Sequence, residues 1–191
     1  EPKTGKVIYE HDANTRRYPA SLTKMMTLYI LFEDLSKGRI KMNQRLSISS
    51  KASIAECSCL RLKSGKRLPA GATITVETAV NALIIQSAND VATSVAEFIS
   101  GSEASFAQRM NQTARKLGMR NTNFVNAHGL PNDNQYTTAQ DMVTLGVALY
   151  NNFPKYYPMF KQTGFYYDGR EIKGHNRVNQ LLDGADGIKT G

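Results

Sequence analysis

Apolar residues at helical spacing dominate the middle of the chain. Those at positions 25, 28, 31, 32 and 35 predict a helix that ends at Gly38. Those at 76, 79, 80, 83 and 84 predict another, with Thr75 as its N-cap. The sequence S-A-N at 87–89 interrupts this second pattern, so we expect a break there before a further helix over about 90–100 that ends at Gly101.

The helical pattern continues beyond position 101. A helix is expected to begin near Ser102, to place apolar residues at 106, 110, 114 and 117 on one face, and to end at Gly118. Thr138 and Asp141 resemble a capping box that opens one more helix before Pro154. The segments between these helices, about 40–72 and 121–126, are more polar and predict loops with brief strands.

Strand-like segments lie near both ends of the sequence. We expect a strand over 6–10, a hairpin over 164–172 around Asp168 and Gly169, and a strand over 187–191. This order predicts an α+β fold: an antiparallel sheet from about 1–20 and 155–191, with a mostly helical portion over about 40–150 inserted. So few strands suggest that the sheet is truncated at both ends of the chain.

Composition and charge narrow the class of protein. The chain has 191 residues, 41% of them hydrophobic and 21% charged, as in ordinary folded domains. No apolar run approaches the roughly 18 residues that a membrane-spanning helix needs. The net charge of +8 suits an anionic partner such as a cell-wall polymer, an anionic lipid or nucleic acid, or simply a solvated surface. The basic residues are scattered and no nucleic-acid-reading motif occurs, which disfavours nucleic acid.

The two cysteines, Cys57 and Cys59, form a C-x-C sequence. The histidines are too far apart in sequence to complete a recognisable zinc motif with them, so no metal site is expected. They are interpreted as two small loop residues, with a labile disulfide as the alternative in an oxidising compartment.

Three short motifs stand in a fixed order along the chain: S-L-T-K at 21–24, S-A-N at 87–89 and K-T-G at 189–191. A serine hydroxyl needs a neighbouring base to act as a nucleophile. Lys24 lies one helical turn from Ser21, and burial together with a nearby cation such as Lys189 would lower its pKa enough to serve. An earlier K-T-G at 3–5 precedes the nucleophile and falls outside this order.

The remaining motif residues suit the other tasks of acyl transfer. Ser87 could relay a proton, and Asn89 could hold the lysine or a substrate amide. Lys189 and Thr190 could receive a substrate carboxylate, while Gly191 leaves room for a substrate along a strand edge. His128 is interpreted as a residue that orders a loop, because serine–lysine chemistry needs no histidine.

The motifs and their surroundings resemble the penicillin-recognising serine enzymes. More narrowly, the sequence is similar to the low-molecular-mass penicillin-binding proteins that are D-alanyl-D-alanine carboxypeptidases, peptidase family S11. The resemblance covers essentially the whole chain, as one transpeptidase-like catalytic domain over 1–191 that is incomplete at its C-terminus. The matching stretches are T-G-K-V-I-Y-E at 4–10, R-R-Y-P-A-S-L-T-K-M-M-T at 16–27, Q-S-A-N-D at 86–90, H-G-L-P at 128–131, T-T-A-Q-D-M at 137–142, H-N-R at 175–177 and D-G-I-K-T-G at 186–191.

The resemblance implies a role for each motif residue. Ser21 would be the acylated nucleophile and Lys24 its base, with Ser87 and Asn89 from the second motif. Lys189, Thr190 and Gly191 would bind the C-terminal carboxylate of a peptidoglycan stem peptide ending in D-Ala-D-Ala. β-Lactams would acylate the nucleophile and remain attached. No cofactor is implied, and the protein would be exported to the periplasm or cell envelope of a bacterium, through a signal that this chain does not contain.

Alternatives remain open at this point. A serine β-lactamase of class A would need a deacylating glutamate, often in E-x-x-L-N, and that pattern does not occur here. A non-catalytic wall-binding relative would be expected to lose some of the motif residues, which are all present. The family continues beyond the third motif with further strands, an oxyanion-hole donor and usually a C-terminal domain or membrane anchor.

Overall fold

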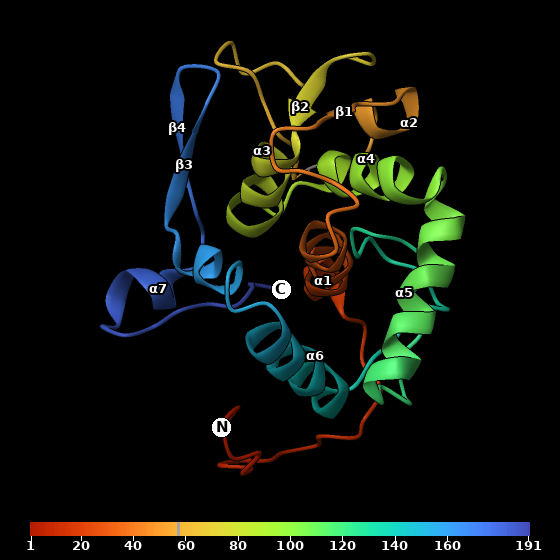
Figure 1. Cartoon of the computed structure of the whole chain (residues 1–191), viewed down its shortest axis with the longest axis vertical. Helices are drawn as coiled ribbons and strands as arrows, with labels where there is room; N and C mark the ends of the chain where they lie inside the picture. Colours follow the sequence, from red (N-terminus) through yellow and green to blue (C-terminus); the bar gives the residue numbers. More distant parts are fainter. Residues whose placement is uncertain (57) are drawn as a thin grey trace.

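A central helix organises the fold. The computed structural model describes residues 1–56 and 58–191. Helix α1 (Thr23–Ser36) lies in the middle, with α4 (Asn89–Ser100), α5 (Glu103–Leu117) and α6 (Ala139–Asn152) packed around it (Figure 1). Nearly every residue of α1 is buried, which is the pattern of a helix covered on all sides rather than on one face.

The expected helix ends are confirmed. Thr75 caps α3 (Val76–Asn81), and its Oγ1 accepts a hydrogen bond from the backbone N–H of Thr78 at 3.1 Å. Ser102 and Thr138 cap α5 and α6 in the same way. After α3 the chain forms a π-helical turn, η2 (Ala82–Gln86), which ends at Ser87, where the predicted break lies.

Aromatic side chains join the end of the helical portion to α1. The ring of Phe32 stacks on Tyr156 with centroids 5.2 Å apart and meets Phe153 and Phe160 edge to face. Phe160 belongs to a short 3₁₀ helix, η3 (Tyr157–Lys161), so this cluster fixes the segment that leads into the last hairpin. All of these rings are buried.

The strands form two separate antiparallel pairs. Strand β1 (Arg45–Ser47) pairs with β2 (Thr73–Thr75), close to the short helix α2 (Ser50–Ser53). Strand β3 (Gly164–Tyr167) pairs with β4 (Arg170–Lys173) and is followed by α7 (Arg177–Leu181). The β3–β4 turn is the predicted one: Asp168 and Gly169 have φ values of 48° and 72°, as a two-residue hairpin turn requires.

Two predicted strands are wrong. Residues 6–10 and 187–191 belong to no strand among the described residues, and neither segment pairs with the β3–β4 hairpin. A strand exists only through its ladder partners, and a period-two pattern alone cannot supply them. The N-terminal segment instead passes alongside α6, with the side chains of Val7, Ile8 and Tyr9 exposed (Figure 1). Residues 121–126 are a loop with a single bridge from Asn123 to Tyr136.

Candidate active site

Ser21 stands at the entrance to the central helix. It lies in a 3₁₀ turn, η1 (Ala20–Leu22), that leads directly into α1. Ala20 has a φ of 47°, a left-handed conformation that is costly for a residue with a side chain and that surrounding contacts must hold in place. One such contact is Gly129, whose φ is +95° and where an added Cβ would overlap the Ala20 carbonyl. The backbone that presents Ser21 is therefore fixed by a tightly packed neighbouring loop.

Lys24 is fully buried one helical turn from Ser21, as the spacing predicted. Its ammonium Nζ lies 3.3 Å from Ser21 Oγ, 2.7 Å from Asn89 Oδ1 and 2.5 Å from the carbonyl oxygen of His128. The first and second motifs are thus joined through this one amine. Because Asn89 and His128 occupy two of its hydrogen-bonding directions, the third is aimed at the serine hydroxyl.

The pKa of Lys24 is lowered to about 7. Burial is the largest cause, the positive charge of Lys189 lowers it further, and the carboxylate of Asp90 acts in the opposite direction. A substantial fraction of the amine is therefore neutral near pH 7 and able to accept a proton. This arrangement confirms the sequence-based expectation that burial and a neighbouring lysine would act together on Lys24.

Ser87 lies at the junction of η2 and α4 in a left-handed conformation with φ of 57°. Its Oγ is buried and has no hydrogen-bond partner among the described residues. The expected proton relay through Ser87 is therefore not formed within the protein itself. A buried hydroxyl without a partner is costly, and such strained, unsatisfied groups concentrate where a ligand completes the bonding.

A loop that sequence reasoning did not single out holds the second motif. The backbone N–H of Asn89 donates to the carbonyl of Ser58 at 2.7 Å, and its Nδ2 donates to the carbonyl of Glu56 at 2.8 Å. The carboxylate of Asp90 accepts the backbone N–H of Leu60 at 3.1 Å, and burial raises the pKa of Asp90 to about 6. Asp90, at the start of α4, therefore fixes this loop, and no short motif in the loop signals that role.

The third motif lies beside the first, although not on a strand. Lys189 Nζ donates to the carbonyl oxygen of Thr190 at 2.7 Å, and burial lowers the pKa of Lys189 to about 8. An added Cβ at Gly191 would lie 3.2 Å from the side chain of Leu22, so the motif packs directly against η1. Thr190 also lines a small pocket, whose other walls include Ile85, His175, Asn176 and Gln180. All three motifs therefore converge around Ser21.

The imidazole of His128 makes its contacts away from Ser21. Its Nε2 lies 3.1 Å from Glu103 Oε1, and its Nδ1 accepts the backbone N–H of Leu130 at 3.0 Å. Only its backbone carbonyl reaches Lys24. The ring orders the loop, which agrees with the interpretation from sequence.

The other expectations concern the cysteines, metals and the membrane. Cys57 lies outside the described residues, whereas Cys59 is buried and disulfide-bonded, which favours the disulfide alternative over two free loop cysteines. Within residues 1–56 and 58–191 no three His, Cys, Asp or Glu side chains gather as metal ligands. None of the helices described is both long and apolar enough to cross a membrane.

Comparison with known proteins settles the family. The sequence pattern of peptidase family S11, described as D-alanyl-D-alanine carboxypeptidase, matches residues 1–191. The chain belongs to this family. It is 38% identical to D-alanyl-D-alanine carboxypeptidase DacF of Bacillus subtilis, over 100% of this chain and 49% of that protein.

Solved structures of penicillin-binding proteins show the same fold. The carboxypeptidase DacD of Francisella tularensis superposes with a TM-score of 0.90 at 30% identity, over 99% of this chain and 57% of the other. Penicillin-binding protein D2 of Listeria monocytogenes, in its ampicillin-bound form, superposes with a TM-score of 0.83 at 28% identity, over 100% of this chain and 75% of the other. The predicted transpeptidase-like α+β fold class is confirmed. The chain spans about half the length of the curated relatives it matches.

Proposed function

We propose that this chain carries the acyl-transfer site of a serine-type D-alanyl-D-alanine carboxypeptidase. The observation that supports it best is the position of the Lys24 amine, 3.3 Å from Ser21 Oγ, with its pKa lowered to about 7. Membership of family S11 supplies the substrate class: a peptidoglycan stem peptide that ends in D-Ala-D-Ala.

Acylation begins at Ser21. The neutral amine of Lys24 takes the proton from the hydroxyl as Oγ attacks the carbonyl carbon of the penultimate D-Ala. The oxygen that becomes negative in the tetrahedral intermediate needs backbone N–H donors near Ser21. The N–H groups of Leu22 and Thr23 already donate within the η1 turn, so the backbone N–H of Ser21 itself is the donor that η1 can offer. Collapse of that intermediate breaks the peptide bond and leaves the stem peptide as an ester on Ser21.

Lys24 protonates the leaving group through Ser87. The terminal D-Ala departs as an amine and must gain a proton, which the Lys24 ammonium supplies through the Ser87 hydroxyl once substrate fills the site. The Oγ of Ser87 is free to make these bonds because it has no partner among the described residues. Water then attacks the ester carbonyl and gives a proton to Lys24. The ester bond breaks, that proton passes to Ser21 Oγ, and the shortened stem peptide leaves with a new carboxylate.

The third motif recognises the end of the peptide. Lys189 and Thr190 lie together beside η1 and offer a cation and a hydroxyl to the terminal carboxylate. Gly191 keeps the space beside Leu22 open. β-Lactams carry a carboxylate and a strained amide, so they acylate Ser21 in the same way and persist as stable esters. The protein acts on the cell wall outside the bacterial cytoplasm, with no metal and no nucleic-acid partner.

Labelling of the full-length protein with a fluorescent penicillin tests this proposal. Wild-type protein and a Ser36→Ala control, altered at the exposed far end of α1, should be labelled covalently, whereas Ser21→Ala should not. Release of D-alanine from a stem pentapeptide should follow the same pattern. Labelling of the Ser21→Ala protein would overturn the assignment of the nucleophile, and rapid repeated hydrolysis of penicillin by the wild type would favour a β-lactamase.

A further inference from the structure

A buried carboxylate outside the three motifs lies behind the lysine base. Glu103 is the first residue of α5, and only 8% of its surface is exposed. Its Oε1 lies 3.1 Å from His128 Nε2 and accepts the backbone N–H of Ala127 at 3.4 Å. Its Oε2 accepts a hydrogen bond from Lys51 Nζ at 2.5 Å. Glu103 therefore holds two successive residues of the loop that reaches the active site.

The same loop contacts α1 on its other side. The carbonyl of Ala127 accepts a hydrogen bond from Thr27 Oγ1 at 2.7 Å, and the carbonyl of His128 accepts one from Lys24 Nζ at 2.5 Å. The next residue, Gly129, packs against the Ala20 carbonyl. Residues 127–129 thus bridge Glu103 on α5 and the nucleophile–base pair at the start of α1.

The hydrogen bonds of the His128 imidazole fix its tautomer. Because Nδ1 of His128 accepts the backbone N–H of Leu130, the ring proton resides on Nε2 and is donated to Glu103. Burial would raise the pKa of Glu103, but hydrogen bonds from His128 and Lys51 lower it to about 2. The carboxylate is therefore ionised throughout the pH range in which a lysine base works, and it is a constant anchor for the ring.

We propose that Glu103 is a positioning residue for acyl transfer: its carboxylate holds residues 127–129 so that the His128 carbonyl orients the Lys24 amine toward Ser21. This inference rests on the function proposed above. The contact with Lys51 has a smaller role, because the side chain of Lys51 is 64% exposed and exposed ion pairs contribute little. Two hydrogen bonds that point into the protein position the loop: Glu103 Oε1 accepts one from the His128 ring and one from the backbone N–H of Ala127.

Three variants of the full-length protein separate this role from others. Glu103→Ala removes both inward hydrogen bonds, whereas Glu103→Gln keeps a carbonyl oxygen that can accept them. Lys51→Ala removes only the outward ion pair. The rate of acylation by a fluorescent penicillin should fall about 10-fold to 100-fold in Glu103→Ala, as misplacement of a catalytic group by a fraction of an ångström does. The other two variants should stay within about threefold of the wild type.

The pH dependence of acylation gives a readout that a loss of stability alone would not move. The charged groups that act on Lys24, namely Lys189 and Asp90, are unchanged in all three variants. If the loop loosens in Glu103→Ala, water reaches the Lys24 amine and relieves the burial that lowers its pKa most strongly. The acylation rate rises with pH as Lys24 loses its proton, and the midpoint of this rise, the acid limb of the profile, reports the pKa of Lys24. This midpoint should therefore move to higher pH in Glu103→Ala and stay in place in Glu103→Gln and Lys51→Ala.

The outcomes are distinguishable. Absence of acylation in the wild-type protein would contradict the proposed function itself. Normal acylation by the wild type together with an unchanged rate and midpoint in a folded Glu103→Ala protein would overturn the positioning role. If circular dichroism shows that Glu103→Ala does not fold, Glu103→Asp takes its place: it keeps the charge but shortens the reach to the loop. A slower rate and a raised midpoint are expected there, and wild-type values would overturn the proposal.

Discussion

Asn89 Oδ1 accepts a 2.7 Å hydrogen bond from Lys24 Nζ, although the two residues are 65 positions apart in the chain. The amide is itself held by the carbonyl of Glu56 through Nδ2. Its oxygen is therefore fixed toward the lysine, and an amide oxygen accepts a hydrogen bond without adding a full negative charge. This choice of residue keeps the lysine oriented while leaving its pKa low.

Replacement of Asn89 by aspartate tests that distinction. Asn89→Asp keeps an oxygen beside Lys24 but adds a negative charge that favours the ammonium form, so the pKa of Lys24 should rise. Acylation at pH 7 should fall by about fivefold or more and recover as the pH is raised, since a rise of one unit from a pKa of about 7 cuts the neutral fraction at pH 7 from about one half to about one tenth. The measurement is the rate of labelled-penicillin acylation from pH 6 to pH 10. Asn89→Ala, which adds no charge, is the control. It should slow acylation, but it should raise the midpoint pH of the profile less than Asn89→Asp does.

The pH profile of the unmodified enzyme follows from two lysines. In the proposed mechanism acylation requires neutral Lys24, so the rate should rise with pH through about 7. Binding of a substrate carboxylate requires charged Lys189, so the second-order rate constant should fall as the pH passes about 8. A narrow bell-shaped profile is expected. A profile that keeps rising to pH 10 would show that the charge of Lys189 is not needed for binding.

Lys189 has a second effect, on Lys24. Its positive charge is one of the causes that lower the pKa of Lys24, so its removal in Lys189→Met should shift the acid limb of the profile to higher pH as well as weaken binding. Lys189→Arg keeps the charge and should keep the position of the acid limb. If the two variants share the wild-type midpoint, the two lysines do not interact in the working enzyme.

Sequence reasoning succeeded where the deciding interactions are local. The caps at Thr75 and Thr138 and the turn at Asp168 and Gly169 depend on neighbours a few residues away, so they were predicted correctly. The pairing of Ser21 with Lys24 follows from helical spacing in the same way.

Non-local contacts could not be predicted from the residues alone. The segment 187–191 was expected to form a strand, but a strand needs a ladder partner, and none of the described segments supplies one. The contacts of Glu56 and Ser58 with Asn89 are made largely through backbone carbonyls, which any residue type carries. The same is true of the His128 carbonyl on Lys24, so no motif marks it.

The aromatic cluster around Phe32 should carry a large share of the stability of the helical portion. Its ring is fully buried against Tyr156, Phe153 and Phe160. Phe32→Ala should lower the free energy of unfolding by about 3–5 kcal/mol, because it removes buried apolar surface and leaves a cavity. Tyr166→Ala is the aromatic control: its side chain is 79% exposed, and the change should stay within about 0.5 kcal/mol. Urea denaturation at constant pH measures both, and equal effects would contradict the packing described.

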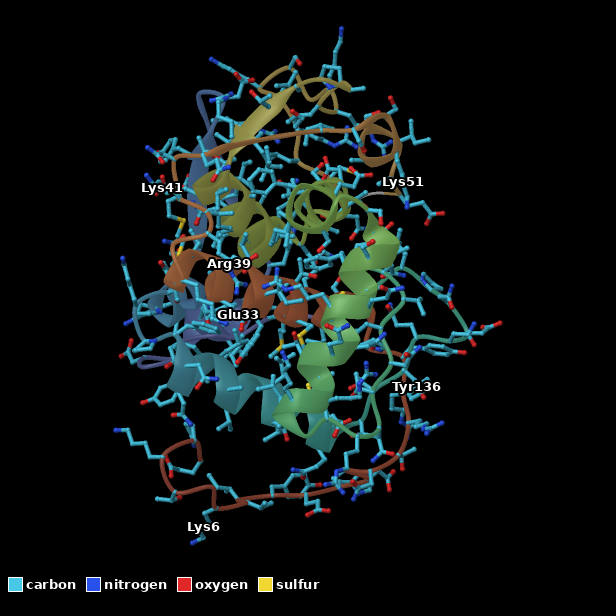
Figure 2. All side chains as sticks on the ribbon, turned by 45° about the vertical axis from the view of Figure 1, so that its right-hand side comes forward. Lys6, Glu33, Arg39, Lys41, Lys51 and Tyr136 are labelled. Atoms are coloured by element: carbon cyan, nitrogen blue, oxygen red, sulfur yellow. The ribbon has the colours of Figure 1, made fainter. Side chains whose placement is uncertain are left out.

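The exposed lysines on the outer surface differ from Lys24 in their hydration. Figure 2 shows Lys6, Lys41 and Lys51 at the periphery of the molecule, whereas Lys24 is completely buried. Peripheral ammonium groups keep their hydration, and only a desolvated lysine near another cation gains the lowered pKa that a base needs. The proposed chemistry therefore depends on the two desolvated amines of Lys24 and Lys189 and not on the net charge of +8.

Gly129 should prove critical because two constraints meet there. Its φ of +95° disfavours any side chain, and an added Cβ would overlap the carbonyl of Ala20, which adjoins the nucleophile. Gly129→Ala should therefore displace the Ser21 backbone and reduce acylation more than 100-fold, beyond its cost in stability. Gly65→Ala is a matched control, since its φ is +81° but nothing lies within 4 Å of the added Cβ. It should cost only about 1–2 kcal/mol of backbone strain and leave the acylation rate unchanged. Equal acylation by the two variants would show that the contact between Gly129 and Ala20 does not position the nucleophile.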